Sequence, residues 1–242
     1  MLIGANPPEA ARLAADAIVE TLAGRARPIS VALAGGSTPA RLYTTLAGPP
    51  YRDRLPWRDM EWFWADERAV PPDHRDSNYR MAAEKLLGPL RIDPDRVHRM
   101  PAERQDLDQA AGEYEHTIRQ RLGNEAPDIP AFDLVLLGVG PDGHTASVFP
   151  GTPALYESQK LVVANYAPSQ KAWRMTMTYP LLEAAREIQF FVLGADKAEI
   201  MARVLSDPPA DLPAAALRRA MGRVTWVLDA EAARLVARPH AE

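Results

Sequence analysis

The chain has 242 residues, with 28 basic and 32 acidic side chains and a formal net charge of −4 at pH 7. It has no cysteine, which excludes disulfide scaffolds, thiolate metal sites and cysteine nucleophiles. The mild acidity and the lack of a Lys/Arg tract argue against a nucleic-acid-coating protein. The longest apolar run, at 132–139, is far shorter than the roughly 20 residues of a membrane helix. We therefore expect a soluble protein of a reducing cytoplasm, with one domain over residues 1–242.

Short apolar runs alternate with helix-like stretches along the whole chain. Strands are predicted at 29–34, 61–65, 132–139, 160–165, 188–193 and 224–228. Amphipathic helices are predicted at 7–23, 39–47, 77–87, 107–122, 196–205 and 229–236. Several strands are apolar on both faces, as in a sheet that is covered on both sides. The alternation predicts an α/β protein with a doubly wound, mostly parallel sheet and helices on both faces.

The connection after the first of these strands has the sequence AGGSTP, at 34–39. In open α/β sheets, ligands bind at the carboxyl ends of the strands. The two glycines allow a ligand to approach the backbone closely, and the N–H groups of a new helix favour an anion. We expect Ser37 or Thr38 to be the N-cap and Pro39 the first helical residue. The alternative is an ordinary capped helix after a tight turn.

The next predicted strand, at 61–65, leads into a loop that begins with Asp66, Glu67 and Arg68, and the sequence SNYR at 77–80 opens the following helix. A strand that delivers two carboxylates and a guanidinium into a loop can supply a base, an orienting group and an anion clamp. The alternative is a solvated surface loop, which the spacing alone favours.

The loop at 138–147, GVGPDGHTAS, follows the most hydrophobic strand and matches the pattern G-x-G-x-x-G. A dinucleotide site needs a helix immediately afterwards and an acidic residue about 20 positions on. Here FPG at 149–151 interrupts any helix, and the next strand ends without an acid. His144, with Asp142 as a partner, is instead predicted to be a general base, the alternative being a loop-bracing histidine. The other four histidines are predicted to lie on the surface: His74, His98, His116 and His240.

A nucleophilic serine finds little support, because Ser147 lies in neither a G-x-S-x-G motif nor a strand-to-helix elbow. The remaining hypothesis is water activated by His144, with nearby cations that hold an anionic group. Arg174 lies in a segment that alternates like a strand, and Lys197 opens the helix after the strand at 188–193. Taken alone, each of these two segments favours a solvated or salt-bridged role over a binding one.

Taken together, these motifs resemble those of the 6-phosphogluconolactonase family. AGGSTP, ADER followed by SNYRM, GVGPDGHTASVFPG, RMTMTYP and GADKA occur in the family's order and approximate spacing. The GPDGHTAS segment is very specific, whereas AGGSTP is shared with sugar-phosphate isomerases. The resemblance implies a Rossmann-like α/β fold and hydrolysis of 6-phospho-D-glucono-1,5-lactone to 6-phospho-D-gluconate, the second step of the oxidative pentose phosphate pathway. It implies no metal and no cofactor, and the sequence indicates no nucleic-acid, membrane or obligate protein partner.

The resemblance also implies roles for individual residues. His144 resembles the catalytic base, and Asp66 and Arg68 resemble groups that contact the lactone end or order His144. The binders of the sugar hydroxyls and the 6-phosphate are expected to be Gly35, Gly36, Ser37, Thr38, Arg174 and Lys197, with Asp142 and Gly143 also in the binding set.

Two other functions compete with this one. Glucosamine-6-phosphate deaminase/isomerase has a similar phosphate turn and D-G-H loop, but that family carries a further carboxylate shortly after the loop. Here no acid follows His144 until Glu157. A non-catalytic sensor of sugar phosphates is the second rival. Such sensors are usually fused to a DNA-binding module, and no helix-turn-helix segment is spare here.

Overall fold

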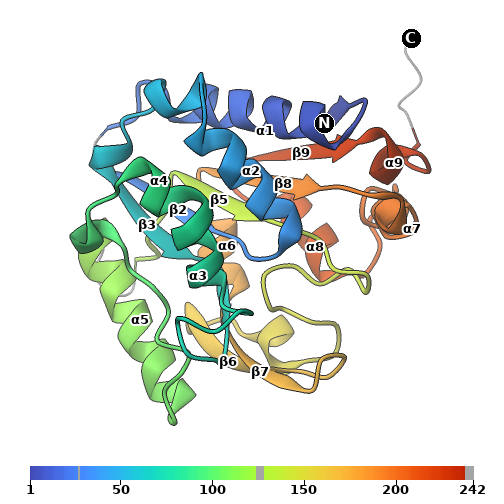
Figure 1. Ribbon diagram of the computed structural model, residues 1–242. Helices are drawn as coiled ribbons and strands as arrows, with labels where there is room; N and C mark the ends of the chain where they lie inside the picture. Colours follow the sequence, from blue (N-terminus) through green and yellow to red (C-terminus); the bar gives the residue numbers. More distant parts are fainter. Residues whose placement is uncertain (27, 124–127, 238–242) are drawn as a thin grey trace.

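The computed structural model describes residues 1–26, 28–123 and 128–237, and this part of the chain contains two β-sheets connected by helices (Figure 1). The larger sheet has six strands, all parallel, in the order β1-β9-β8-β5-β2-β3. The smaller sheet has three antiparallel strands in the order β4-β7-β6. The strands are β1 (Leu2–Gly4), β2 (Ile29–Leu33), β3 (Met60–Trp64), β4 (Asp66–Arg68), β5 (Leu134–Leu137), β6 (Val162–Ala167), β7 (Ala172–Met177), β8 (Glu187–Val192) and β9 (Arg223–Asp229).

Helices cover both faces of the large sheet. Figure 1 shows α1 and α2 on one side of it and α6 and α8 on the other. The α-helices are α1 (Pro7–Leu22), α2 (Ser37–Ala47), α3 (Asn78–Ala82), α4 (Gly88–Leu90), α5 (Leu107–Leu122), α6 (Tyr179–Glu183), α7 (Ala198–Val204), α8 (Pro213–Ala216) and α9 (Ala230–Ala233). A π-helical segment, Ala83–Leu87, continues α3 over the rest of the helix predicted at 77–87. The predicted doubly wound, mostly parallel α/β fold is confirmed.

The central strands form the core of the molecule. Every residue of β2, β3, β5 and β8 is buried. Strands that are covered by helices on both faces are largely apolar on both faces. The buried polar exceptions in these four strands are Ser30, Glu61, Glu187 and Gln189. Among the described residues, no helix is long and apolar enough to cross a membrane.

The strand order places a switch point between β2 and β5. From β2 the chain proceeds to β3 on one side, whereas from β5 it proceeds to β8 and β9 on the other. The connections that leave β2 and β5 therefore diverge and open a crevice at the carboxyl edge of the sheet.

The smaller sheet was only partly predicted. The run at 160–165 does form a strand, β6, but it pairs antiparallel with β7. The expectation that Asp66, Glu67 and Arg68 lie in a loop is wrong, because they form β4. Ala65 is the joint between the two sheets: its N–H donates to the Leu33 carbonyl at 2.9 Å, and its carbonyl accepts from the Met177 N–H at 2.8 Å. The single domain expected over 1–242 stays a prediction.

Candidate active site

A cleft of about 350 Å³ lies at the switch point. Its volume is within the range of small-molecule sites, about 300–1,000 Å³. Asp142 and Gly143 immediately precede His144 in the chain but are not among the residues that line the cleft. The other predicted site residues do line it: Gly35, Gly36, Ser37, Thr38, Asp66, Arg68, His144, Arg174 and Lys197.

His144 lies in a tight turn after β5 and is paired with Asp142. Its Nδ1 is 2.5 Å from Asp142 Oδ1, and its backbone N–H donates to the same oxygen at 3.2 Å. Because an ionised carboxylate only accepts hydrogen bonds, Nδ1 carries the proton and Nε2 keeps its lone pair. The imidazole also packs on Phe149, with 4.2 Å between ring centroids. This arrangement suits a base that takes a proton at Nε2.

No α-helix follows this turn directly. The next helical residues are the 3₁₀ turn Pro153–Tyr156, after the break at 149–151. The G-x-G-x-x-G pattern therefore lacks the helix that a dinucleotide site requires.

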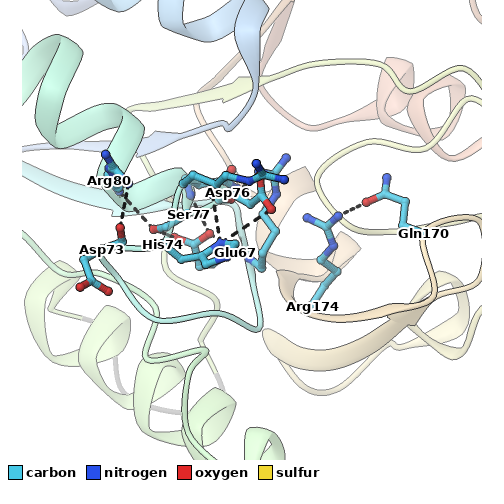
Figure 2. A network of polar contacts seen from close by, with 11 residues as sticks. Glu67, Asp73, His74, Asp76, Ser77, Arg80, Gln170 and Arg174 are labelled. Atoms are coloured by element: carbon cyan, nitrogen blue, oxygen red, sulfur yellow. Dashed lines mark hydrogen bonds and ion pairs between the residues drawn. The ribbon is translucent and has the colours of Figure 1, made fainter.

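Arg68 and Arg174 face each other across the pair β4 and β7. Arg68 Nη1 donates to the Asp76 carbonyl at 2.6 Å, and Arg174 donates to the Gln170 side chain (Figure 2). Arg174 is only 7 % exposed, so burial, and then the charge of Arg68, lower the pKa of its guanidinium. Like charges directly opposite one another are unfavourable in a sheet. An anion bound in the cleft would relieve that repulsion.

Helix α2 begins two residues earlier than predicted, at Ser37 instead of Pro39. Gly36 is the N-cap, with φ of 105°, and no side chain caps the helix, so the expectation that Ser37 or Thr38 is the N-cap is wrong. Only glycine adopts such a φ without strain, which lets the helix begin at Ser37. Pro39 is tolerated as the third residue because the N–H groups of the first turn lack intrahelical partners. These uncapped N–H groups can bind an anion.

Lys197 comes from the opposite side of the switch point. It ends the 3₁₀ turn Ala195–Lys197, which follows β8 and precedes α7. Its Nζ is 3.8 Å from Asp196 Oδ2, and its side chain is 20 % exposed. An ammonium held so loosely by one exposed carboxylate is available to an anionic ligand.

Asp66 has partners that sequence reasoning missed. Its Oδ2 accepts from Ser147 Oγ at 2.6 Å, and Asn78 Nδ2 donates to its carbonyl at 2.8 Å and to Oδ1 at 3.3 Å. The carboxylate that bonds His144 is that of Asp142, not of Asp66. Ser147 lies in the motif TAS, just after His144, and Asn78 lies in the motif SNYR, which follows the DER segment. This proximity in sequence to predicted site residues was the signal that could have indicated a role for them.

His98 was predicted to lie on the surface, and this prediction is wrong. Its side chain is 8 % exposed, and its Nε2 is 2.6 Å from Glu61 Oε2. Burial lowers the pKa of His98, and its ring packs against Phe63. The prediction overlooked that Glu61 is itself buried on β3 and offers a partner. His74 and His116 are exposed as predicted, and His240 lies outside the described residues.

Glu67 anchors α3 to the small sheet (Figure 2). Its buried carboxylate accepts from the backbone N–H groups of Asn78 at 2.7 Å and of Tyr79 and Arg68 at 2.8 Å. It also accepts from Ser77 Oγ at 3.1 Å. Burial raises the pKa of Glu67, and the three backbone bonds oppose that effect. The carboxylate thereby fixes the start of the helix that carries Asn78.

Replacing Glu67 with alanine is expected to lower the free energy of unfolding by about 3 kcal/mol or more. Several donors lose their acceptor in a buried place, at about 1–3 kcal/mol for each group left unsatisfied. Urea unfolding monitored by circular dichroism measures the change. The control is Glu84→Ala, because Glu84 is exposed and its ion pair with Arg80 lies at the surface, where such a pair contributes little to stability. Equal effects of the two substitutions would contradict the anchoring role.

Comparisons with known proteins show the family to which this chain belongs. The family model for glucosamine-6-phosphate isomerases/6-phosphogluconolactonase matches residues 6–226. A Synechocystis protein named 6-phosphogluconolactonase is 40 % identical over 205 residues, covering 84 % of this chain and 82 % of that protein. The Streptomyces coelicolor protein of that name is 36 % identical over 222 residues, covering 89 % and 85 %. The structure of 6-phosphogluconolactonase from Trypanosoma cruzi superposes with a TM-score of 0.86 at 33 % identity, covering 96 % and 95 % of the two chains. The chain belongs to the glucosamine-6-phosphate isomerase/6-phosphogluconolactonase family.

Proposed function

We propose that this protein hydrolyses 6-phospho-D-glucono-1,5-lactone to 6-phospho-D-gluconate by means of water that His144 activates. The observation that carries this proposal is the His144–Asp142 pair beside a cleft lined by three cations and an uncapped helix N-terminus. The relatives named 6-phosphogluconolactonase support the same reaction.

In the proposed mechanism, His144 Nε2 removes a proton from water as the oxygen adds to C1 of the lactone. Asp142 holds the Nδ1–H and stabilises the imidazolium that results. The tetrahedral intermediate carries an oxyanion, which Arg68 is placed to stabilise from the wall of the cleft. Collapse of the intermediate breaks the bond between C1 and the ring oxygen, and His144 returns its proton to that oxygen. The product is an open-chain acid, which ionises at neutral pH.

The 6-phosphate is proposed to bind in the same cleft, between the first turn of α2, Lys197 and Arg174. The uncapped N–H groups of a helix N-terminus favour phosphate. The two cations come from different elements and would contact different phosphate oxygens. Because the phosphate does not react, contacts to it hold the ground state and the transition state equally.

Replacing Lys197 with methionine is therefore expected to raise KM by about 10–100-fold, which corresponds to the loss of a charged hydrogen bond of about 1.5–3 kcal/mol. The turnover number kcat should change much less, because uniform binding is lost. Steady-state kinetics separate the two constants. Lys160→Met is the control, since Lys160 is exposed and does not line the cleft. A pure loss of kcat would instead place Lys197 at the lactone carbonyl.

The reaction itself is tested by a coupled assay. The lactone is generated enzymatically from glucose 6-phosphate, and its hydrolysis is compared with the spontaneous rate. Ammonia release from glucosamine 6-phosphate is measured in parallel. We expect hydrolysis well above background and no ammonia. No excess hydrolysis at micromolar protein would refute the proposal.

The deaminase alternative lacks a residue that it needs. The first acid after His144 is Glu157, which does not line the cleft and accepts instead from the backbone N–H groups of Gln159 and Lys160. No carboxylate therefore follows the D-G-H loop at the place where that reaction requires one.

A cytoplasmic location belongs to the same proposal. A sugar phosphate carries charge at neutral pH and does not cross the hydrocarbon core of a bilayer unaided, so the enzyme is expected where its substrate is made. Cell fractionation with an antibody against the protein tests this location.

A further inference from the structure

Asn78 connects two parts of the cleft that the reaction needs. It is the first residue of α3 and only 1 % exposed. On one side, its Nδ2 donates to the backbone carbonyl and the Oδ1 of Asp66. On the other side, its carboxamide lies against Gly35, in the turn that leads into α2: a Cβ on Gly35 would overlap Oδ1, Cγ and Nδ2 of Asn78.

The Asn78 carboxamide cannot rotate freely. Its backbone N–H is held by Glu67 at 2.7 Å, and its Oδ1 is buried without a hydrogen-bond partner among the described residues. A buried amide gives up one acceptor at a cost of about 1–3 kcal/mol only where its other contacts demand that orientation. Here the demanding contacts are the two hydrogen bonds to Asp66 and the close approach of Gly35.

We propose that Asn78 is a positioning residue that holds the Asp66 carboxylate at a fixed distance from the Gly35 turn. The role rests on the proposed function: Asp66 lines the cleft that would hold the lactone, and the Gly35 turn leads into the helix N-terminus that would hold the phosphate. A second side chain, Ser147, holds Oδ2 of Asp66 and so fixes its other oxygen. Gly35 is required because only a residue without a Cβ leaves room for the carboxamide.

Two single variants test the first contact. Asn78→Ala removes the donor, whereas Asn78→Asp keeps the volume beside Gly35 and replaces the donor with an acceptor that repels Asp66. Both are expected to lower kcat by about 10–100-fold, the scale seen when a side chain that orients another loses its partner. KM should stay within about threefold, because the phosphate contacts remain. Normal kcat in both variants would overturn the role.

A double-mutant cycle tests the contact between Asn78 and Gly35. Gly35→Ala alone is expected to lower kcat at least as far as Asn78→Ala, because its Cβ displaces the carboxamide. In the double variant Gly35→Ala/Asn78→Ala the methyl group occupies the space that Asn78 leaves. The double variant should therefore be no slower than Gly35→Ala alone, whereas independent effects would multiply. Multiplying effects would overturn the role.

Ser77→Ala is the matched control. Ser77 caps α3 and donates to Glu67, but within the described part of the chain its side chain makes no hydrogen bond to Asp66 or Gly35. Ser77→Ala should lower the melting temperature and leave kcat unchanged. If it lowers kcat as far as the Asn78 variants do, Asn78 only stabilises the helix and the proposed role is overturned. Thermal unfolding of each variant shows which are folded, and Asn78→Asp carries the test if Gly35→Ala does not fold. If the wild-type protein has no lactonase activity, the proposed function and this role are both overturned. If the wild type is active but the effects of Gly35→Ala and Asn78→Ala on kcat multiply, only this role is overturned.

Discussion

Replacing His144 with alanine is expected to lower kcat for lactone hydrolysis by about 10²–10⁴-fold, the usual contribution of a general base. The substitution removes the lone pair at Nε2 and leaves Asp142 without its partner. A δ-lactone is a reactive ester and hydrolyses spontaneously. The rate must therefore be corrected for the uncatalysed reaction, and residual activity from the cations of the cleft is expected.

His116→Ala is the matched control for that measurement. His116 is exposed on α5 and does not line the cleft, so its loss should leave kcat and KM unchanged. Circular dichroism of both variants establishes that they are folded. Near-normal turnover of His144→Ala would show that another group activates water. The histidine would then only brace the loop, as the alternative from the sequence has it.

The regular elements of this fold could be predicted because their signals are local. The steps of three and four between apolar residues of α5 describe one buried face, and the structure buries Ala111, Tyr114 and Ile118 there. The strand β4 could not be predicted in the same way. Three residues, Asp66 to Arg68, have no apolar alternation, and they form a strand only because β7 lies alongside them. A strand stabilised by a distant partner leaves no trace in its own sequence.

The candidate site follows the same division. Most residues that line the cleft follow strands of the large sheet, so the rule for open α/β sheets located them from the order of the elements. Arg174 is an exception, because it lies within β7 of the small sheet. The contacts of Asp66 with Ser147 and Asn78 depend on how β4, α3 and the loop that carries Ser147 meet, and these partners lie 81 and 12 residues from Asp66 in the chain. The same holds for His98, whose partner Glu61 lies 37 residues away on β3. Residue type and spacing carry no information about such distances.

Gly140→Ala is expected to lower kcat nearly as far as His144→Ala, although it changes no group that touches substrate. A Cβ on Gly140 would lie 2.7 Å from Nε2 of His144 and still closer to Nδ1 and Cε1. The ring would have to leave its place, and its bond to Asp142 would break with it. The backbone gives no comparable reason for glycine, since Gly140 does not have a positive φ.

Gly112→Ala provides the control, because nothing lies within 4 Å of a Cβ built there and Gly112, on α5, does not line the cleft. Its kcat should stay within about twofold of wild type, as for a substitution that meets no neighbour. Equal losses in the two variants would refute the specific clash with His144. If only Gly140→Ala loses activity, the second glycine of the G-x-G pattern has a different purpose from that in a dinucleotide site. It makes room for the imidazole, where a dinucleotide site makes room for a pyrophosphate. The same G-x-G motif is then used here to accommodate a general base that activates water.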